Sequence, residues 1–439
     1  MDETAIVVVA AAIFVWGAVS ARLERADLTA PIVFMGVGAA LAAFHLVDAP
    51  SAPGTVRPLV ELTLVWVLFA DAARVPLRTM RTDLGQFVRL LGVGLPLSIL
   101  LGWGLAVWLF PGFGVWLALL VAAALAPTDA ALGVPVVTNP LVPARVRRLI
   151  TVESGLNDGI ATPVVMFAIA GAASAEGLEE AQGLATAAAE LALGAVVGLL
   201  LGAVGGLVLR VARRRGWATE DFTGAAVLAL AVAAYAGAVA LHGNGFVAAF
   251  CGGLAFGAMA GRRGPEELAF LEQASGLVSL LVWLVFGAIA VPVMVDHLDV
   301  RIVLYAVLSL TLVRMLPVAL ASLGSGLGRS TVLFVGWFGP RGLASLVFAL
   351  IALEELGPEA EGALAVITVT VFLSVIAHGL SAAPLAARYG RAEGAKDAVG
   401  AEGTAGAPGA DGAGGGVGPA AADGIPEVPV RGLPRRTPP

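Results

Sequence analysis

The stretch LITVESGLNDGIATPVVMF, residues 149–167, places two carboxylates, a serine and an asparagine inside an apolar run long enough to cross a bilayer. The four are Glu153, Ser154, Asn157 and Asp158, and at ~100° per residue they share one face of a helix. A charge at the bilayer centre costs ~2.5–3.5 kcal/mol, so such residues normally face a water-filled cavity or a partner and mark an ion or proton path. The stretch predicts an ion site within a membrane helix, with a purely structural ion pair as the alternative.

The composition of the whole chain is that of a membrane protein. Hydrophobic residues make up 59% of the 439 residues, charged residues make up 13%, and the mean hydropathy is +0.92. That leaves too little polar surface for a water-soluble globule of this size. The apolar runs approach the ~20 residues of a membrane helix and lack the alternation of a barrel strand. We predict an all-α polytopic protein with about thirteen spans: 5–20, 29–47, 57–71, 87–109, 114–137, 150–174, 185–209, 221–241, 245–261, 270–294, 300–323, 330–353 and 361–386.

The distribution of charge predicts the topology. Most of the 26 Lys and Arg residues lie on alternate connections, and only Arg57 and Arg301 lie on the others. By the positive-inside rule the N-terminus is outside and the C-terminus is cytoplasmic. The acidic start MDETAIVVV is unlike a cleaved signal peptide. Residues 1–388 are predicted to form the transmembrane domain, and the Gly/Ala/Pro-rich residues 389–439 a disordered cytoplasmic tail.

Two spans, the fifth and the twelfth, are predicted to be interrupted. In LAPTDAALGVPVV, Pro127 breaks the helix, and Thr128 and Asp129 can cap a new one. In GWFGPRGLASLVF, Pro340 and its flanking glycines break the helix beside Arg341. If spans 1–6 and 8–13 are inverted six-helix repeats, the breaks are equivalent, which is typical of a transporter's midplane site, whereas a kink without function is the alternative. We expect Asp129 to balance partial charges at helix N-termini and Arg341 at C-termini.

The buried charges also suggest which acids form ion pairs and which bind the transported ions. Arg314, in LSLTLVRMLPVAL, needs an anion inside the membrane, and Glu153 is our candidate. Asp71, in LVWVLFADAARVPLR, is either interfacial or part of the site. If Glu153 is neutralised by Arg314, then Asp71 and Asp158 are free to exchange a proton for a cation.

Together the motifs LFADA, PTDA, ESGLNDG and GPRG resemble the monovalent cation:proton antiporter-1 family, the bacterial sodium/proton antiporters related to eukaryotic sodium/proton exchangers. The resemblance covers residues 5–388. It implies thirteen spans in an inverted repeat, a core domain that moves against a dimerisation domain, a homodimer in a bacterial plasma membrane, and Na⁺/H⁺ exchange without a cofactor. The resemblance implies that Asp158 carries the cation and the proton and that Asp71 is its acidic co-ligand. Ser154 and the Thr128 carbonyl are implied as further ligands of a transient Na⁺ or K⁺. The implied supporting residues are Asn157, Asp129 and Glu153, of which Glu153 also forms a structural ion pair with Arg314.

Several alternatives stay open at this stage. Relatives with two acids at positions 157 and 158 are the electrogenic ones, so Asn157 suggests electroneutral exchange, and K⁺ could replace Na⁺. An intramembrane protease lacks its signature motifs here, and a channel would need a selectivity filter. We therefore predict no enzyme and no nucleic-acid partner, with lipid as the surroundings. Glycines recur every four residues at 194–206, a face for close helix contact within the chain or at a dimer seam. His242 and His378 are expected to be packing or capping residues.

Overall fold

The computed structural model describes residues 3–24, 28–46, 56–75, 83–177, 184–261 and 264–405, and within these ranges the chain is helical with no strand. It divides into a compact unit, Met1–Gly394, and a second unit, Ala395–Pro439. The first helices are α1 Glu3–Glu24, α2 Ala30–Ala43, α3 Arg57–Ala73, α4 Leu84–Arg89, α5 Leu95–Leu109, α6 Gly114–Leu125, α7 Val134–Val137 and α8 Ala144–Ala175. The others are α9 Leu184–Arg214, α10 Glu220–Ala240, α11 Gly245–Met259, α12 Gly264–His297, α13 Val300–Leu310, α14 Leu312–Ala321, α15 Arg329–Trp337, α16 Leu343–Leu356 and α17 Glu361–Ala405.

The helices have the length and composition expected of membrane spans, which confirms the predicted fold class. Within the described ranges, eight helical stretches are long and apolar enough to cross a bilayer. Three further apolar helices are shorter: Ala30–Ala43, Pro111–Leu125 and Gly245–Met259. The count of thirteen and the inverted repeat remain predictions. The predicted boundary at 388 lies inside α17, which continues to Ala405. The rest of the predicted tail, 406–439, lies outside the described residues.

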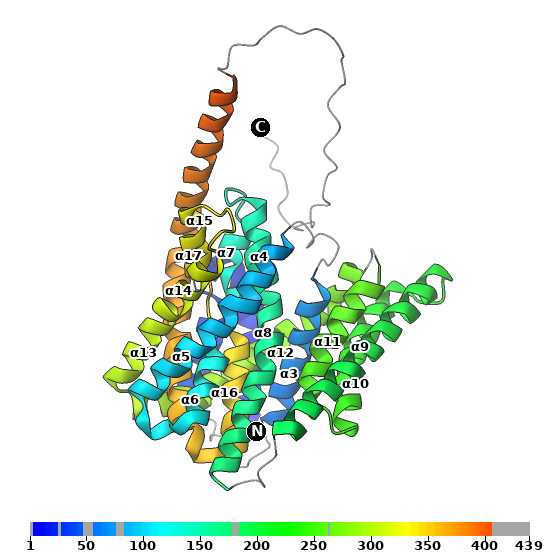
Figure 1. Cartoon of the computed structure of the whole chain (residues 1–439). Coiled ribbons are helices and arrows are strands. Elements are labelled where there is room, and N and C mark those ends of the chain that lie inside the picture. Colours follow the sequence, from blue (N-terminus) through cyan, green and yellow to red (C-terminus); the bar gives the residue numbers. More distant parts are fainter. Residues whose placement is uncertain are drawn as a thin grey trace, which may run out of the picture. The chain divides into compact units, whose positions relative to one another are not determined.

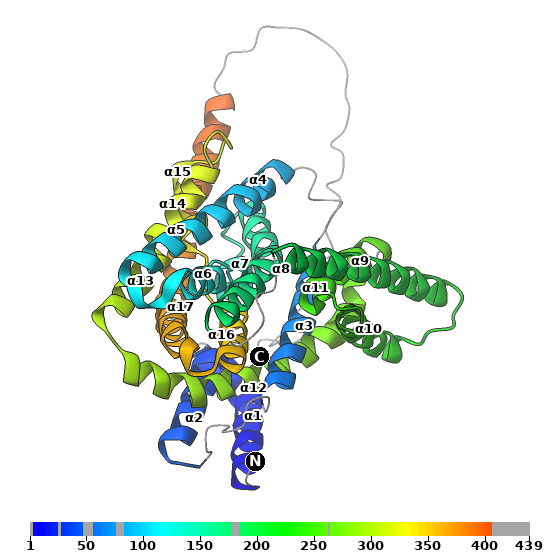
Figure 2. The ribbon, with the colours of Figure 1, turned by 60° about the horizontal axis from the view of Figure 1, so that its bottom comes forward.

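Within the first unit the helices form two groups. Figures 1 and 2 both show α9, α10 and α11 side by side with α3 at one edge, and α5, α6, α13 and α17 at the opposite edge. α8 lies between the groups and contacts α3 and α11 on one side and α6 and α16 on the other. The stretch quoted at the outset therefore lies where the two groups meet.

The glycines of α9 explain its close packing. A Cβ on Gly194, Gly198 or Gly202 would run into the backbone of α11, at Asn244, Ala248 and Gly252 respectively. Glycine every four residues thus lets two helix backbones touch. Of the two readings left open by the sequence, the structure shows the contact within the chain.

Prolines shape two of the helices around the site. A π-helical turn, Leu90–Gly94, joins α4 to α5, and Pro96 is the second residue of α5. The missing N–H of Pro96 disrupts the regular hydrogen-bond ladder in this turn. In α8, Pro163 lies inside the helix. The carbonyl of Gly159, one turn earlier, therefore lacks its usual intrahelical donor.

Candidate functional site

The polar face of α8 is buried. Glu153, Ser154, Asn157 and Asp158 are exposed by only 3%, 4%, 1% and 7%. Because these side chains would otherwise meet hydrocarbon, each needs a partner or a function inside the protein. The structure gives the four residues different surroundings, described one by one below.

Glu153 lies against Arg314 of α14. Arg314 donates from Nη1 to Glu153 Oε1 over 2.6 Å and from Nη2 to Oε2 over 3.0 Å. Both side chains are almost fully buried. A two-point guanidinium–carboxylate contact is the strongest ionic arrangement available to these side chains. It joins α8 to α14 and neutralises one of the two acids in the motif.

Thr128 connects the fifth-span break to α8. Its hydroxyl oxygen is 2.9 Å from Ser154 Oγ and accepts a hydrogen bond of 2.7 Å from Asn157 Nδ2. The Oδ1 atom of Asn157 is buried and has no hydrogen-bond partner among the described residues. Three hydroxyl and amide groups thus gather beside Asp158, and one acceptor oxygen is left over for a cation or a water.

Asp158 has no such partner. In the described part of the chain no hydrogen bond or ion pair reaches its carboxylate, and the charged groups that act on it are two other acids, Asp71 and Asp129. Asp71 belongs to α3, which touches α8 one turn before Asp158: a Cβ on Gly155 would lie 3.5 Å from the Asp71 carbonyl oxygen. The positively charged group that acts on the Asp71 carboxylate is the Arg74 guanidinium, which forms an ion pair with Glu272.

The two predicted breaks meet each other. α6 ends at Leu125, and the second gap separates α15 from α16. Arg341 Nη1 donates to the carbonyl oxygens of Ala126 and Pro127 over 3.0 and 3.1 Å, next to the C-terminus of α6. The Leu343 N–H, at the N-terminus of α16, donates to Asp129 Oδ2 over 3.2 Å. Each break thus supplies a side chain whose charge complements the helix end at the other break.

The sequence predicts His378 only as a packing or capping residue, and it does not indicate two contacts of the site. Phe250 of α11 packs its ring on Gly159, so that a Cβ there would overlap the ring. Ser374 and His378 of α17 lie beneath the second break, where Ser374 Oγ accepts from the Arg341 N–H over 2.7 Å. The only signals were a glycine next to Asp158 and a histidine in an apolar span. His242, by contrast, is exposed in the turn between α10 and α11, with a φ of 61°.

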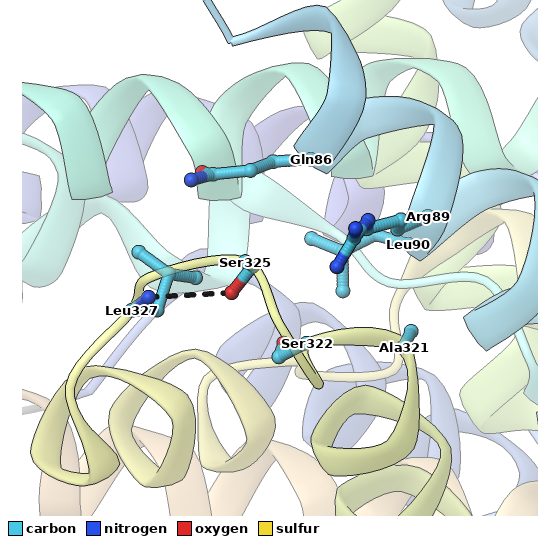
Figure 3. A pocket seen from close by; sticks show the side chains of 7 residues that line it. All are labelled: Gln86, Arg89, Leu90, Ala321, Ser322, Ser325 and Leu327. Carbon is cyan, nitrogen blue, oxygen red and sulfur yellow. Dashed lines mark hydrogen bonds between the residues drawn. The ribbon is translucent and has the colours of Figure 1, made fainter.

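A small cavity lies apart from the predicted site residues. Figure 3 shows its lining, with Gln86, Arg89 and Leu90 on one side and the turn after α14 on the other. Its volume is about 10 Å³, which holds about one water molecule. None of the residues predicted to bind a cation or a proton lines it.

Comparison with known proteins identifies the family. The family described as "Sodium/hydrogen exchanger, transmembrane" matches residues 8–388. The chain belongs to the sodium/hydrogen exchanger family. The resemblance inferred from the motifs is thereby confirmed. The family consists of secondary transporters rather than enzymes, and its members use no cofactor.

Individual relatives agree with this assignment. Over 332 residues the exchanger chain is 26% identical to a K⁺/H⁺ antiporter, NhaP, from Alkalimonas amylolytica, and the match covers 74% of the chain. The chain spans only about half of that relative's length, 56%. Its fold is similar to that of the sodium proton antiporter MjNhaP1 from Methanocaldococcus jannaschii at pH 8, with a TM-score of 0.73 at 19% identity, covering 88% of this chain and 98% of that one. An electron-microscopy structure of the same antiporter gives a TM-score of 0.67.

Proposed function

We propose that this exchanger is a monovalent cation/proton antiporter in which a proton and a cation compete for Asp158 and Asp71. The observation that carries the proposal is the buried Asp158 carboxylate, on which the other acids Asp71 and Asp129 act and which forms no ion pair within the described residues. A buried anion beside like charges is strongly disfavoured. Such a site is stable when it holds a proton or a cation, and exchange follows if it opens to one side of the membrane at a time.

The surroundings of Asp158 fit a hard monovalent cation. Ser154 and Thr128 supply hydroxyl oxygens, Asn157 supplies an unpartnered amide oxygen, and the Thr128 carbonyl, in the non-helical segment after α6, is a further candidate ligand. Oxygen atoms of this kind are the ligands that hard cations prefer. We assign Glu153 to the ion pair rather than to the ligand set, because Arg314 neutralises its charge. The role of Asp129 is to cap α16.

Na⁺ is our first candidate substrate, exchanged one for one with H⁺. The single acid at the Asn157–Asp158 pair supports an electroneutral exchange, since only one carboxylate at these two positions exchanges a proton for a cation. K⁺ is the alternative, favoured by the sequence similarity to an antiporter named for K⁺/H⁺ exchange, whereas the structural similarity is to one named for sodium. Further parts of the proposal are a homodimer in the bacterial plasma membrane, an external N-terminus and a cytoplasmic segment from residue 389.

The test is a transport assay in inverted bacterial vesicles that hold a pH-sensitive dye. Addition of Na⁺, K⁺ or Li⁺ should restore fluorescence as protons leave, and the cation that acts at the lowest concentration is the substrate. Asp158→Asn should abolish the response, whereas the exposed control Asp299→Asn, at the start of α13, should keep it. A full response in Asp158→Asn would overturn the site. A rate that changes when the membrane potential is clamped at different values would overturn electroneutrality.

A further inference from the structure

Ser374 and His378 form a buried hydrogen-bonded pair one turn apart on α17. They are exposed by 0% and 1%. His378 Nδ1 lies 3.1 Å from Ser374 Oγ and 2.8 Å from the Ser374 carbonyl oxygen, whereas Nε2 reaches another helix, 2.8 Å from the carbonyl oxygen of Trp337. Which ring nitrogen donates depends on the tautomer: with the proton on Nε2 the ring donates to the Trp337 carbonyl, and its Nδ1 then accepts from the Ser374 hydroxyl instead of donating to the Ser374 carbonyl. The pair therefore holds the last carbonyl of α15.

The same pair holds the other side of the break. Ser374 Oγ accepts the backbone N–H of Arg341 over 2.7 Å. Trp337 and Arg341 bracket the interruption between α15 and α16. One hydrogen-bonded chain thus runs from Arg341 through Ser374 and His378 to Trp337, and it closes both ends of the non-helical segment. Groups freed by a broken helix need such partners at membrane depth.

The segment held in this way touches the cation site directly. A Cβ on Gly339, at its centre, would come within 2.9 Å of Thr128 Cγ2 and would also meet the Arg314 guanidinium. Thr128 is hydrogen-bonded to Ser154 and Asn157, and Arg314 to Glu153. The backbone of the second break therefore packs against Thr128 and Arg314, which in turn hold the polar residues next to Asp158. A shift of this backbone segment would therefore displace Thr128 and Arg314 together.

We propose that His378 and Ser374 are positioning residues for cation exchange, which clamp the 337–341 segment and thereby place Thr128 and Arg314 at the ion site. The inference rests on the proposed function, because it assigns the pair a part in that same site. Neither residue touches the cation. The pair acts by keeping the ligands in register, and outer groups of this kind commonly change ion affinity or activity by about 10- to 100-fold when removed.

The experiment uses four variants of the full chain. Ser374→Ala removes the link to Arg341, and His378→Phe keeps the shape of the ring without its hydrogen bonds. His378→Gln restores a donor for the Trp337 carbonyl. Ser381→Ala is the matched control: it lies on the same helix and accepts from the indole N–H of the same Trp337 over 2.9 Å, but it does not hold the break.

Three quantities are measured: the apparent KM for Na⁺, the maximal exchange rate per folded protein, and the stabilisation of the purified protein against heat by Na⁺. Ser374→Ala and His378→Phe should raise the apparent KM and weaken the Na⁺-dependent stabilisation by about tenfold in Na⁺ concentration. His378→Gln should recover most of the loss, and Ser381→Ala should match the unaltered chain. A lower melting temperature with an unchanged Na⁺ dependence in both Ser374→Ala and His378→Phe would show a merely structural role and overturn the inference.

The readouts separate this inference from the proposed function. If the unaltered chain is stabilised by Na⁺ but exchanges no protons, antiport is wrong, and the clamp is still judged by the Na⁺ dependence of its variants. If antiport occurs and the two variants keep a normal Na⁺ dependence, the clamp is wrong and antiport stands. If Na⁺ neither stabilises the chain nor is exchanged, K⁺ is used in the same measurements, and failure with K⁺ as well overturns both.

Discussion

The backbone N–H of Asp129 donates to the carbonyl oxygen of Pro340 over 2.8 Å, so the two interrupted segments are joined main chain to main chain. This bond lies between the two side-chain caps, Asp129 on α16 and Arg341 on the carbonyls after α6. Both segments are buried, and their freed backbone groups are satisfied largely by each other. A disturbance of either break is therefore transmitted to the other, and to Thr128 beside it.

Gly342→Ala should disrupt this crossing. A Cβ at position 342 would overlap the carboxylate of Asp129, which is held in place by its bonds to Pro340 and Leu343. Because overpacking of a tight site costs about 1–3 kcal/mol, we expect a lower melting temperature and a loss of most exchange activity. The control is Gly379→Ala in α17, where an added Cβ meets nothing within 4 Å. Normal activity of Gly342→Ala would show that the crossing is not tightly packed in solution.

The ion pair between Glu153 and Arg314 should show strong coupling. Both partners are buried, so Glu153→Gln or Arg314→Met alone leaves an uncompensated charge and should destabilise the protein by about 3–5 kcal/mol. The double variant removes both charges and should be more stable than either single variant. Chemical or thermal unfolding in detergent measures this double-mutant cycle. Additive losses would mean that the two residues are not coupled.

The site residues that could be predicted from the sequence are the ones for which burial leaves few choices. Arg314 and Glu153 are opposite charges inside apolar spans, so their pairing follows from the cost of burying either alone. Pro127 is followed by the cap-forming Thr128 and Asp129, and Pro340 lies among glycines, so both breaks could be placed, whereas Pro163 lies inside α8.

The contacts that could not be predicted depend on how helices pack. Ser374 and His378 have no distinctive spacing or charge, and their role becomes visible only when α17 lies beneath the second break. Phe250 is one phenylalanine among many, and only the crossing of α11 with α8 brings it to Gly159. The same holds for the glycines of α9, whose pattern indicates a close contact but not its partner.

Acid should weaken the contact between α4 and α8 at Asp83. Arg145 Nε donates to its Oδ1 over 2.9 Å and Arg148 Nη2 to its Oδ2 over 2.6 Å. Burial alone would raise the pKa of this carboxyl, but the hydrogen bonds from Arg148 and Arg145 outweigh it and hold the pKa below its usual value. The stabilisation is therefore present above the unfolded pKa of ~3.9 and is lost as the pH falls through the folded value.

Asp83→Asn tests this pH dependence. At neutral pH we expect a loss of about 1 kcal/mol, modest because Arg145 is half exposed and the solvent screens the pair. Melting temperatures of the unaltered chain and the variant should differ by a constant amount above about pH 5, and the difference should shrink as the pH falls below about 4 and through the folded pKa. Asp299→Asn alters an exposed and distant pair, so its melting temperature should equal that of the unaltered chain at both neutral and acidic pH. A difference that persists undiminished at pH 3 would contradict the assignment.

The last prediction concerns the contact of α8 with α11 next to Asp158. The ring of Phe250 rests on Gly159, and Gly155 rests on the Asp71 backbone one turn earlier. These two glycines are where the helix that carries Asp158 touches the group formed by α3 and α11. If exchange requires α8 to move against α3 and α11, then a side chain added on this face of α8 should lower the exchange rate.

Gly159→Ala should slow exchange several-fold, because its Cβ would overlap the Phe250 ring and overpacking of this kind costs about 1–3 kcal/mol. Adding Phe250→Leu should restore much of the rate by making room for the new methyl group. Gly155→Ala is the matched control on the same face of the same helix, since its Cβ would make only ordinary contacts, the nearest at 3.5 Å. Alanine also favours helix over glycine by up to ~1 kcal/mol, so a loss in one variant and not in the other isolates the steric effect. Equal rates in both alanine variants would mean that the Phe250 contact does not restrain the movement of α8.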